Sequence, residues 1–245
     1  MKLSIVMPAF NERRTIREIV SRVLAVDLGA LEKELIVVDD GSTDGTGDLL
    51  KELDGRDGVR VLVQARNMGK GAAVARGFRE AAGDILIVQD ADMEYDPREY
   101  LVVLRPILEG DADVVFGSRF LGSTRGHRVL YFWHSVGNRL LTLLSNIVTD
   151  LNLTDMETCY KAMTRDVASR LDLRSRRFGV EPEITCKVSR LGARVYEVPI
   201  SYRGRTYAEG KKIGWKDALQ ALWTLLRFAR WAPPKDGAGT LMSRG

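Results

Sequence analysis

The sequence predicts an α/β protein with a mostly parallel sheet flanked by helices. Short apolar segments rich in Val, Ile and Leu alternate with segments of helical periodicity through the first half of the chain. The hydrophobic share of 45% and the charged share of 29% indicate a globular chain with a core, and exclude disorder, collagen and coiled coil. The 245 residues allow one large domain or two small ones.

The elements of the first half follow one another as strand and helix. Apolar runs predict strands over residues 3–7, 34–38, 59–63, 84–89 and 113–118. Apolar spacing of about 3.6 residues predicts helices over 12–26, 46–53, 69–82 and 97–108. Crossovers of this kind are right-handed, and ligands bind beyond the carboxyl ends of such strands.

The second half is less regular. Residues 129–148 and 178–191 have helical patterns, and residues 192–200 predict a late strand. Exposed apolar side chains within 129–148 would suit a dimer or a membrane contact.

An amphipathic helix is expected over residues 213–231, with Lys216, Gln220, Thr224 and Arg227 forming its polar stripe. It carries too many charges to span a bilayer, so it either packs on the core or lies in a membrane interface. We therefore expect a main domain over 1–212, this C-terminal amphipathic helix over 213–232, and a flexible tail over 233–245.

Charge is distributed unevenly along the chain. Residues 1–116 carry 22 acidic and 15 basic side chains, whereas residues 117–231 carry 10 and 20. An acidic half suits a metal and a nucleotide, and a basic half suits phosphate, a membrane surface or nucleic acid, unless the charges are only solvated surface. The sequence has no helix-turn-helix, zinc-finger or basic aromatic pattern, so we expect no nucleic-acid partner.

The sharpest chemical signal is Gln89-Asp-Ala-Asp-Met-Glu94, which follows a very apolar run. Side chains alternate along an extended segment, so Asp90, Asp92 and Glu94 are expected on one face. Such charges need a cation, and Mg²⁺ or Mn²⁺ bound by one or two carboxylates and substrate phosphates is the natural candidate. A solvent-facing acidic turn is the alternative.

One of two glycine-containing loops could approach a nucleotide. In Val37-Val-Asp-Asp-Gly-Ser-Thr-Asp-Gly-Thr46, an Asp leaving a buried strand can accept a hydrogen bond from a base, or the loop is an ordinary turn before a helix. Arg66-Asn-Met-Gly-Lys-Gly71 is not a Walker A loop, because no Ser or Thr follows Lys70.

A candidate phosphate-binding wall comprises Arg119, Arg139, Arg203, Arg205, Lys211 and Lys212.

Taken together, these segments resemble the family 2 glycosyltransferases of the GT-A fold, which is Rossmann-like, and among them the dolichol-phosphate and polyprenol-phosphate mannose synthases. The similar segments are Pro8-Ala-Phe-Asn-Glu12, Val37–Gly45, Asn67-Met-Gly-Lys-Gly71, Asp90-Ala-Asp92, Gly117-Ser-Arg-Phe120, and Arg205 with Lys211. They lie within about residues 3–212. Glu94 stands where the synthases usually carry Gln.

The resemblance implies roles by position. Residues implied in nucleotide-sugar binding are Pro8, Phe10, Glu12, Val37, Asp39, Lys70, Asp90, Ala91, Asp92, Arg119, Arg205 and Lys211. The implied catalytic residues are Asp90, Asp92 and Arg119, and the implied ligands of Mg²⁺ or Mn²⁺ are Asp92 and Glu94. The acceptor phosphate would contact Arg119, Arg139 and Arg205.

We expect a metal-dependent, inverting transfer of mannose or glucose from a GDP- or UDP-sugar to a polyprenyl phosphate. A phosphate acceptor is already ionised and needs no general base, and the basic half offers no conspicuous one. A soluble or glycan hydroxyl acceptor is the alternative, with Asp155 or Glu157 as its base. A protein that binds a nucleotide sugar without turnover is a third interpretation.

The expected location is the cytoplasm, at the cytosolic membrane face. Two cysteines, Cys159 and Cys186, are too few for a disulfide scaffold, which favours a reducing compartment. The first apolar run meets Asn11 and Glu12 at once and reads as a strand, not a signal peptide. The expected partners are the sugar donor, the polyprenyl phosphate and the membrane surface, with a homodimer as a further option.

Overall fold

The computed structural model describes residues 1–122, 128–129, 131–204 and 215–233. The strands are β1 (Lys2–Ala9), β2 (Glu32–Asp39), β3 (Val59–Val63), β4 (Ile85–Val88), β5 (Val114–Ser118), β6 (Lys161–Thr164) and β7 (Val195–Pro199). The helices are α1 (Ile16–Ala25), α2 (Thr46–Leu53), α3 (Lys70–Glu80), η1 (Pro97–Glu99), α4 (Tyr100–Leu108), α5 (Phe132–Thr149), α6 (Arg165–Arg170), α7 (Val180–Arg190) and α8 (Trp215–Phe228).

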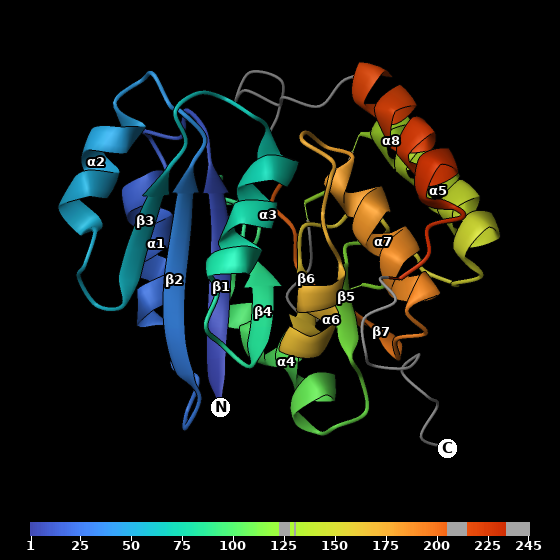
Figure 1. Ribbon diagram of the computed structural model, residues 1–245, viewed down its shortest axis with the longest axis horizontal. Helices are drawn as coiled ribbons and strands as arrows, with labels where there is room; N and C mark the ends of the chain where they lie inside the picture. The colour runs from blue at the N-terminus through green and yellow to red at the C-terminus, as the bar shows by residue number, and fades with distance from the viewer. Residues whose placement is uncertain (123–127, 130, 205–214, 234–245) are drawn as a thin grey trace.

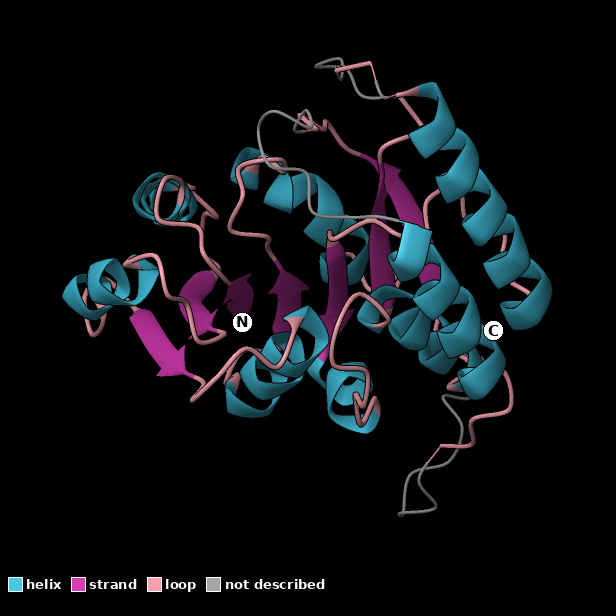
Figure 2. Ribbon diagram, turned by 90° about the horizontal axis from the view of Figure 1, so that it is seen from above, coloured by secondary structure: helices cyan, strands magenta, loops and turns pink. Residues whose placement is uncertain are grey.

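The described strands form one sheet in the order β3-β2-β1-β4-β6-β5-β7, with helices on both faces (Figures 1 and 2). Strands β1, β2, β3 and β4 pair in parallel, and Ile5 lies between Leu35 and Ile87 in the register. The predicted α/β class with a mostly parallel sheet is confirmed. The apolar side chains of β1, β2 and β4 are buried almost throughout, as expected for parallel strands covered on both faces, whereas Val63 of β3, at the edge of the sheet, is exposed.

Strand β6 departs from the prediction, which contained no strand there. It runs antiparallel to both β4 and β5 and separates them in the sheet. The sequence Lys161-Ala-Met-Thr164 has only four residues and begins with a lysine, so its apolar pattern is weak. Lys161 is nevertheless 1% exposed, because its ammonium donates to the carbonyl oxygens of Met156 and Thr158.

Helices α5, α7 and α8 pack against one another at one end of the sheet (Figure 1). Cys186, Leu225 and Phe228 form a small apolar cluster between α7 and α8. The expected polar stripe of the C-terminal helix is partly wrong, because Thr224 is buried and Leu226 is exposed. Residues 234–245 of the predicted tail lie outside the described residues, and the division into parts stays a prediction. Within the described ranges, no helix combines the length and hydropathy needed to cross a bilayer.

Candidate functional site

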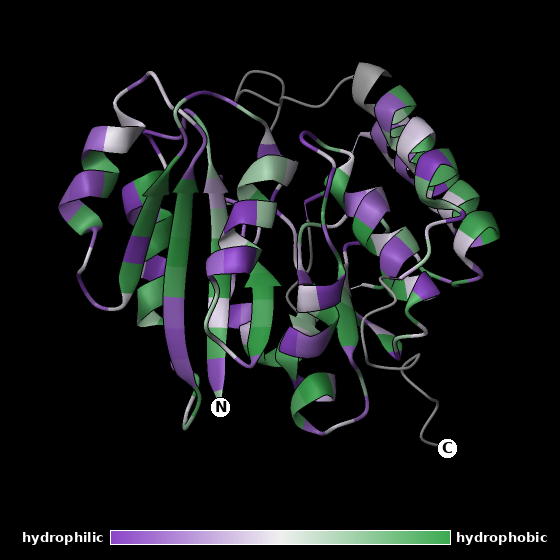
Figure 3. Ribbon diagram, in the orientation of Figure 1, coloured by the Kyte–Doolittle hydropathy of each residue, from purple (hydrophilic) through white to green (hydrophobic). Residues whose placement is uncertain are grey.

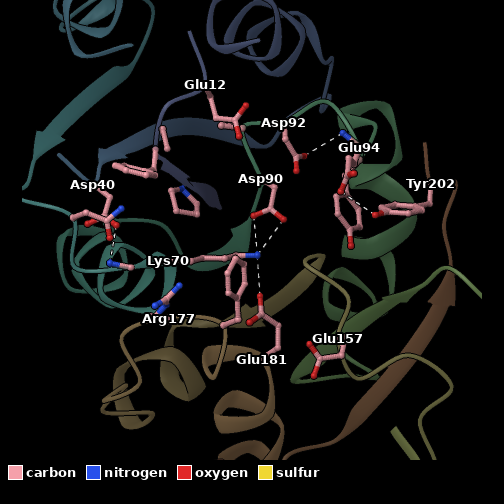
Figure 4. A pocket seen from close by; sticks show the side chains of 18 of the residues that line it. Glu12, Asp40, Lys70, Asp90, Asp92, Glu94, Glu157, Arg177, Glu181 and Tyr202 are labelled. Carbon is pink, nitrogen blue, oxygen red and sulfur yellow. Dashed lines mark hydrogen bonds and ion pairs between the residues drawn. The ribbon is translucent and has the colours of Figure 1, made fainter. Parts of the chain in front are cut away.

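A cavity of about 310 Å³ opens beyond the carboxyl ends of β1 and β4 (Figure 4). This is where the parallel-sheet prediction placed the ligand. The predicted residues that line it are Pro8, Phe10, Glu12, Lys70, Asp90, Ala91, Asp92, Glu94 and Arg119. Residues that the sequence did not single out for this role also line it: Asp40, Asn67, Tyr95, His134, Arg177, Phe178, Glu181 and Tyr202.

The acidic segment lies in a turn, because β4 ends at Val88. The expectation that Asp90, Asp92 and Glu94 share one face of an extended segment is therefore wrong. Met93 has a φ of 67°, and the backbone N–H of Glu94 donates to Asp92 Oδ1 at 3.2 Å. The turn still brings the side chains of Asp92 and Glu94 to the cavity wall.

Asp90 forms an ion pair with a lysine that it shares with Glu181. Lys70 Nζ lies 2.8 Å from Asp90 Oδ1 and 2.9 Å from Glu181 Oε1, and this chain of ion pairs crosses the centre of Figure 4. Burial lowers the pKa of Lys70, but Asp90 and Glu181 outweigh it and raise that pKa well above its usual value. All three carboxylates line the cavity, but Asp90 is paired with Lys70, so Asp92 and Glu94 are the candidate metal ligands.

The glycines around Lys70 serve close packing. A side chain at Gly71 would overlap the carbonyl oxygen of Ser175, and one at Gly69 would overlap that of Arg176. Gly69 also has a φ of 93°, which favours glycine. The Asn67–Gly71 motif therefore lets α3 start directly against the 175–177 segment, which brings Lys70 and Arg177 to one cavity.

Arg119 is held by Asp155. Arg119 Nε lies 2.6 Å from Asp155 Oδ2, and Arg119 Nη2 lies 2.7 Å from Asp155 Oδ1. Asn138 Nδ2 donates to the same carboxylate at 3.1 Å, and Asp155 is fully buried. Asp155 is one of two candidate bases for the alternative hydroxyl acceptor, and the geometry does not favour it, because both of its oxygens accept hydrogen bonds and it does not line the cavity.

Glu157 does reach the cavity. Its Oε1 atom is buried and has no hydrogen-bond partner among the described residues. Burial and the neighbouring Glu181 raise the pKa of Glu157 to about 7, although Lys161 and Arg119 act in the opposite direction. A carboxyl group that titrates near neutral pH can hold or accept a proton at this wall.

Some predicted residues lie elsewhere. Neither Val37 nor Asp39 is among the lining residues of the cavity. Val37 is fully buried in β2, and Asp39 is buried with Oδ1 accepting from the Ser42 N–H at 3.0 Å. Arg139 is exposed on α5, with its guanidinium 5.7 Å from the Phe120 ring centroid, and it is not a lining residue either. Arg205, Lys211 and Lys212 lie outside the described residues.

Asp40 and Asn67 lie in the two glycine-containing loops described above, 37–46 and 66–71. Asp40 stabilises the second of these loops. Its carboxylate accepts from the N–H groups of Met68 and Gly69, each at 2.7 Å, and so fixes the loop before α3. Arg177 ends the basic segment Arg174-Ser-Arg-Arg177, which is a local sequence signal for an anion-binding residue. Glu181 and Tyr202 carry no local signal, because contacts distant in the chain bring them here.

Asp92 and Glu94 offer carboxylate oxygens, which are ligands that Mg²⁺ and Mn²⁺ prefer. Tyr202 Oη donates to Glu94 Oε2 at 2.9 Å, and burial and Glu94 together raise the pKa of Tyr202. In the part of the chain that the structure describes, no group of three or more His, Cys, Asp or Glu side chains is arranged to hold a metal. Mg²⁺ and Mn²⁺ commonly take one or two carboxylates and complete their shells with phosphates and water, so two carboxylates suffice.

Three comparisons place the chain among known proteins. Residues 4–172 match the model of glycosyl transferase family 2. The chain is 31% identical over 231 residues to an undecaprenyl-phosphate mannosyltransferase of Micrococcus luteus, which covers 87% of this chain and 88% of the relative. It is 29% identical over 235 residues to a dolichol-phosphate mannosyltransferase of Pyrococcus furiosus, covering 94% of this chain but only 64% of the relative's length.

The fold is also similar to a solved structure, that of glucosyl-3-phosphoglycerate synthase from Mycobacterium tuberculosis in complex with Mn²⁺, UDP and phosphoglyceric acid. The TM-score is 0.71 at 24% identity, covering 97% of this chain and 81% of that one. At this identity the likeness concerns the fold alone, and the predicted GT-A fold is confirmed. Because the family model matches more than half of this chain, the chain belongs to the family 2 glycosyltransferases.

Proposed function

We propose that this chain is a metal-dependent, inverting hexosyltransferase that moves mannose or glucose from a GDP- or UDP-sugar to a polyprenyl phosphate at the cytosolic face of a membrane. One observation carries the proposal. A single cavity brings the carboxylates of Asp92 and Glu94 together with the cationic groups of Arg119 and Arg177. The names of the Micrococcus and Pyrococcus relatives support a polyprenyl phosphate as the acceptor.

The donor nucleotide would lie along the carboxyl end of β1. Pro8 and Phe10 offer apolar surface to a base, and the Glu12 carboxylate can accept hydrogen bonds from ribose hydroxyls. The diphosphate would then reach Asp92 and Glu94. A Mg²⁺ or Mn²⁺ ion bound there supplies positive charge that stabilises the departing diphosphate.

The arginines orient the phosphates. Asp155 fixes the Arg119 guanidinium, whose remaining N–H groups can donate to an acceptor phosphate. In the transfer, an acceptor phosphate oxygen attacks C1 of the sugar from the side opposite the diphosphate. The new C1–O bond forms as the C1–O bond to the diphosphate breaks, which inverts the anomeric configuration. An ionised phosphate makes this attack without a general base.

A hydroxyl acceptor is the second candidate, and Glu157 favours it. A hydroxyl nucleophile must lose a proton, and the Glu157 carboxyl group lines the cavity with a pKa of about 7. The two candidates share the donor site and differ in the need for this residue.

The test is incubation of the purified protein with labelled GDP-mannose or UDP-glucose, Mn²⁺ and a short-chain polyprenyl phosphate. Labelled lipid is the expected product, and it should disappear when EDTA removes the metal. If no donor labels the lipid although donor binds, the proposal fails and a binding protein without turnover is favoured.

A further inference from the structure

Helix α5 buries polar side chains and exposes apolar ones. Its four buried residues are all polar, namely Asn138, Thr142, Ser145 and Thr149. Large apolar side chains of the same helix are exposed instead, by 39% to 77%: Phe132, Trp133, Val136, Leu140, Leu143 and Ile147. A helix whose outer face meets water normally shows the opposite arrangement.

The buried polar stripe has a structural explanation. Asn138 donates to Asp155, and Thr142 Oγ1 accepts from the Met156 N–H at 3.2 Å. These contacts hold the segment that fixes Arg119. The apolar stripe of α5 has no such explanation within the described chain, because it faces outward.

Helix α8 extends the apolar face. Leu219, Trp223 and Leu226 are exposed by 57%, 64% and 61%, whereas Thr224 is 5% exposed. Helices α5 and α8 pack on each other, and Figure 3 shows hydrophobic segments along both. We call the exposed apolar residues of these two helices the α5–α8 surface.

The α5–α8 surface adjoins the cavity. His134, in the first turn of α5, lines the cavity, and its neighbour Trp133 is 77% exposed. Tryptophan is enriched where membrane meets water. The surface also favours negative headgroups, because α5 contains no acidic residue and exposed Arg139 and Arg227 stand next to Leu140 and Leu226.

We propose that the α5–α8 surface docks on the interface of a bilayer that contains anionic lipids and so presents the cavity to the headgroups. The inference rests on the proposed function, since it explains how a membrane-held polyprenyl phosphate reaches the cavity. A second copy of the chain would cover the apolar stripe equally well. It would not account for the arginines on the same faces or for the adjoining cavity.

The test is co-sedimentation of the full chain with phosphatidylcholine vesicles, with and without phosphatidylglycerol. The wild type should bind, and more strongly when phosphatidylglycerol is present. The double variant Leu143→Ser/Trp223→Ser should lower vesicle affinity by about tenfold or more. The control Leu101→Ser/Val102→Ser removes side chains of α4 that are 46% and 45% exposed, and it should bind like the wild type.

Three results would overturn the docking proposal. They are no vesicle binding by the wild type, equal binding by the α5–α8 double variant, and an apolar-surface dimer in analytical ultracentrifugation that the double variant dissolves. Transfer to a short-chain acceptor in detergent is measured in parallel. Transfer without vesicle binding refutes the docking alone, whereas vesicle binding without any transfer refutes the proposed function alone.

Discussion

Arg119 and Asp155 form a double ion pair in which the carboxylate is fully buried, with N···O distances of 2.6 and 2.7 Å. The backbone N–H of Arg119 donates to the same carboxylate at 3.1 Å. Strand β5 is followed directly by Arg119, and Asn138 of α5 also binds Asp155. The pair therefore joins the end of the sheet to the helix that borders the cavity.

Replacing Asp155 with Asn should lower the free energy of unfolding by about 3–5 kcal/mol, because the buried Arg119 charge loses its partner. The control is Asp113→Asn, whose partner Arg194 is 45% exposed in its side chain, and a cost of about 1 kcal/mol or less is expected there. Urea unfolding measures both. Equal, small losses would contradict the structural role of Asp155.

The close approach of α3 to the 175–177 segment can be tested with two helical glycines. Gly71→Ala should destabilise the protein by about 1–3 kcal/mol, because the new methyl group would overlap the Ser175 carbonyl oxygen. Gly137→Ala in α5 meets nothing within 4 Å and should stabilise by about 0.5–1 kcal/mol through helix propensity. Thermal unfolding of both variants checks the opposite signs, and a stabilising Gly71→Ala would be inconsistent with this packing.

The metal site predicts a selective effect of Asp92→Asn. Transfer should fall by about 100-fold or more, and the Mn²⁺-dependent part of nucleoside diphosphate binding should be lost, while the circular dichroism spectrum is unchanged. The exposed Asp48 of α2 offers the control Asp48→Asn, which should behave as wild type. Titration calorimetry with and without Mn²⁺ makes the measurement. Full metal-dependent binding by Asp92→Asn would remove this residue from the site.

Glu157 should make stability depend on pH. Its pKa is about 7 when folded, against an ordinary 4.5, so the folded chain binds more protons between these values. The contribution of Glu157 to stability therefore falls as pH rises from about 4.5 to about 7. Glu157→Gln removes that loss, so the variant should gain in melting temperature relative to wild type across this range. A difference that stays constant with pH would speak against the raised pKa.

The same substitution separates the two acceptor classes. With a phosphate acceptor, Glu157→Gln should keep turnover within about tenfold of wild type, because no proton is removed from the nucleophile. With a hydroxyl acceptor, turnover should fall by about 100-fold or more while donor affinity is kept. Steady-state kinetics and donor titration distinguish these results.

Local patterns predicted the first half of the fold well. The helix over 46–53 and the strand over 59–63 have the predicted bounds, because apolar spacing and flanking turns set them within the segment. The prediction that Asp90, Asp92 and Glu94 share one face failed, because side chains alternate between faces only while a strand continues, and β4 ends at Val88. Strand β6 was missed because its pairing with β4 and β5 is decided by residues far away in the sequence.

Some site residues could likewise be predicted from local sequence, whereas others are placed by contacts distant in the chain. Carboxylates after strand ends, such as Asp92, could be placed at the cavity from sequence, because the edge of a parallel sheet collects them. The partners of Lys70 and Arg119 could not, since Glu181 and Asp155 lie 111 and 36 positions away along the chain. Burial of Thr224 and exposure of Trp223 likewise depend on packing among α5, α7 and α8.

A direct comparison of two acceptors tests the central claim. Labelled donor, Mn²⁺ and wild-type protein are incubated with polyprenyl phosphate or with the polyprenol of the same chain length. Label should appear on the phosphate-bearing lipid only. Label on the polyprenol, or on neither lipid while the donor is bound, would contradict transfer to a phosphate.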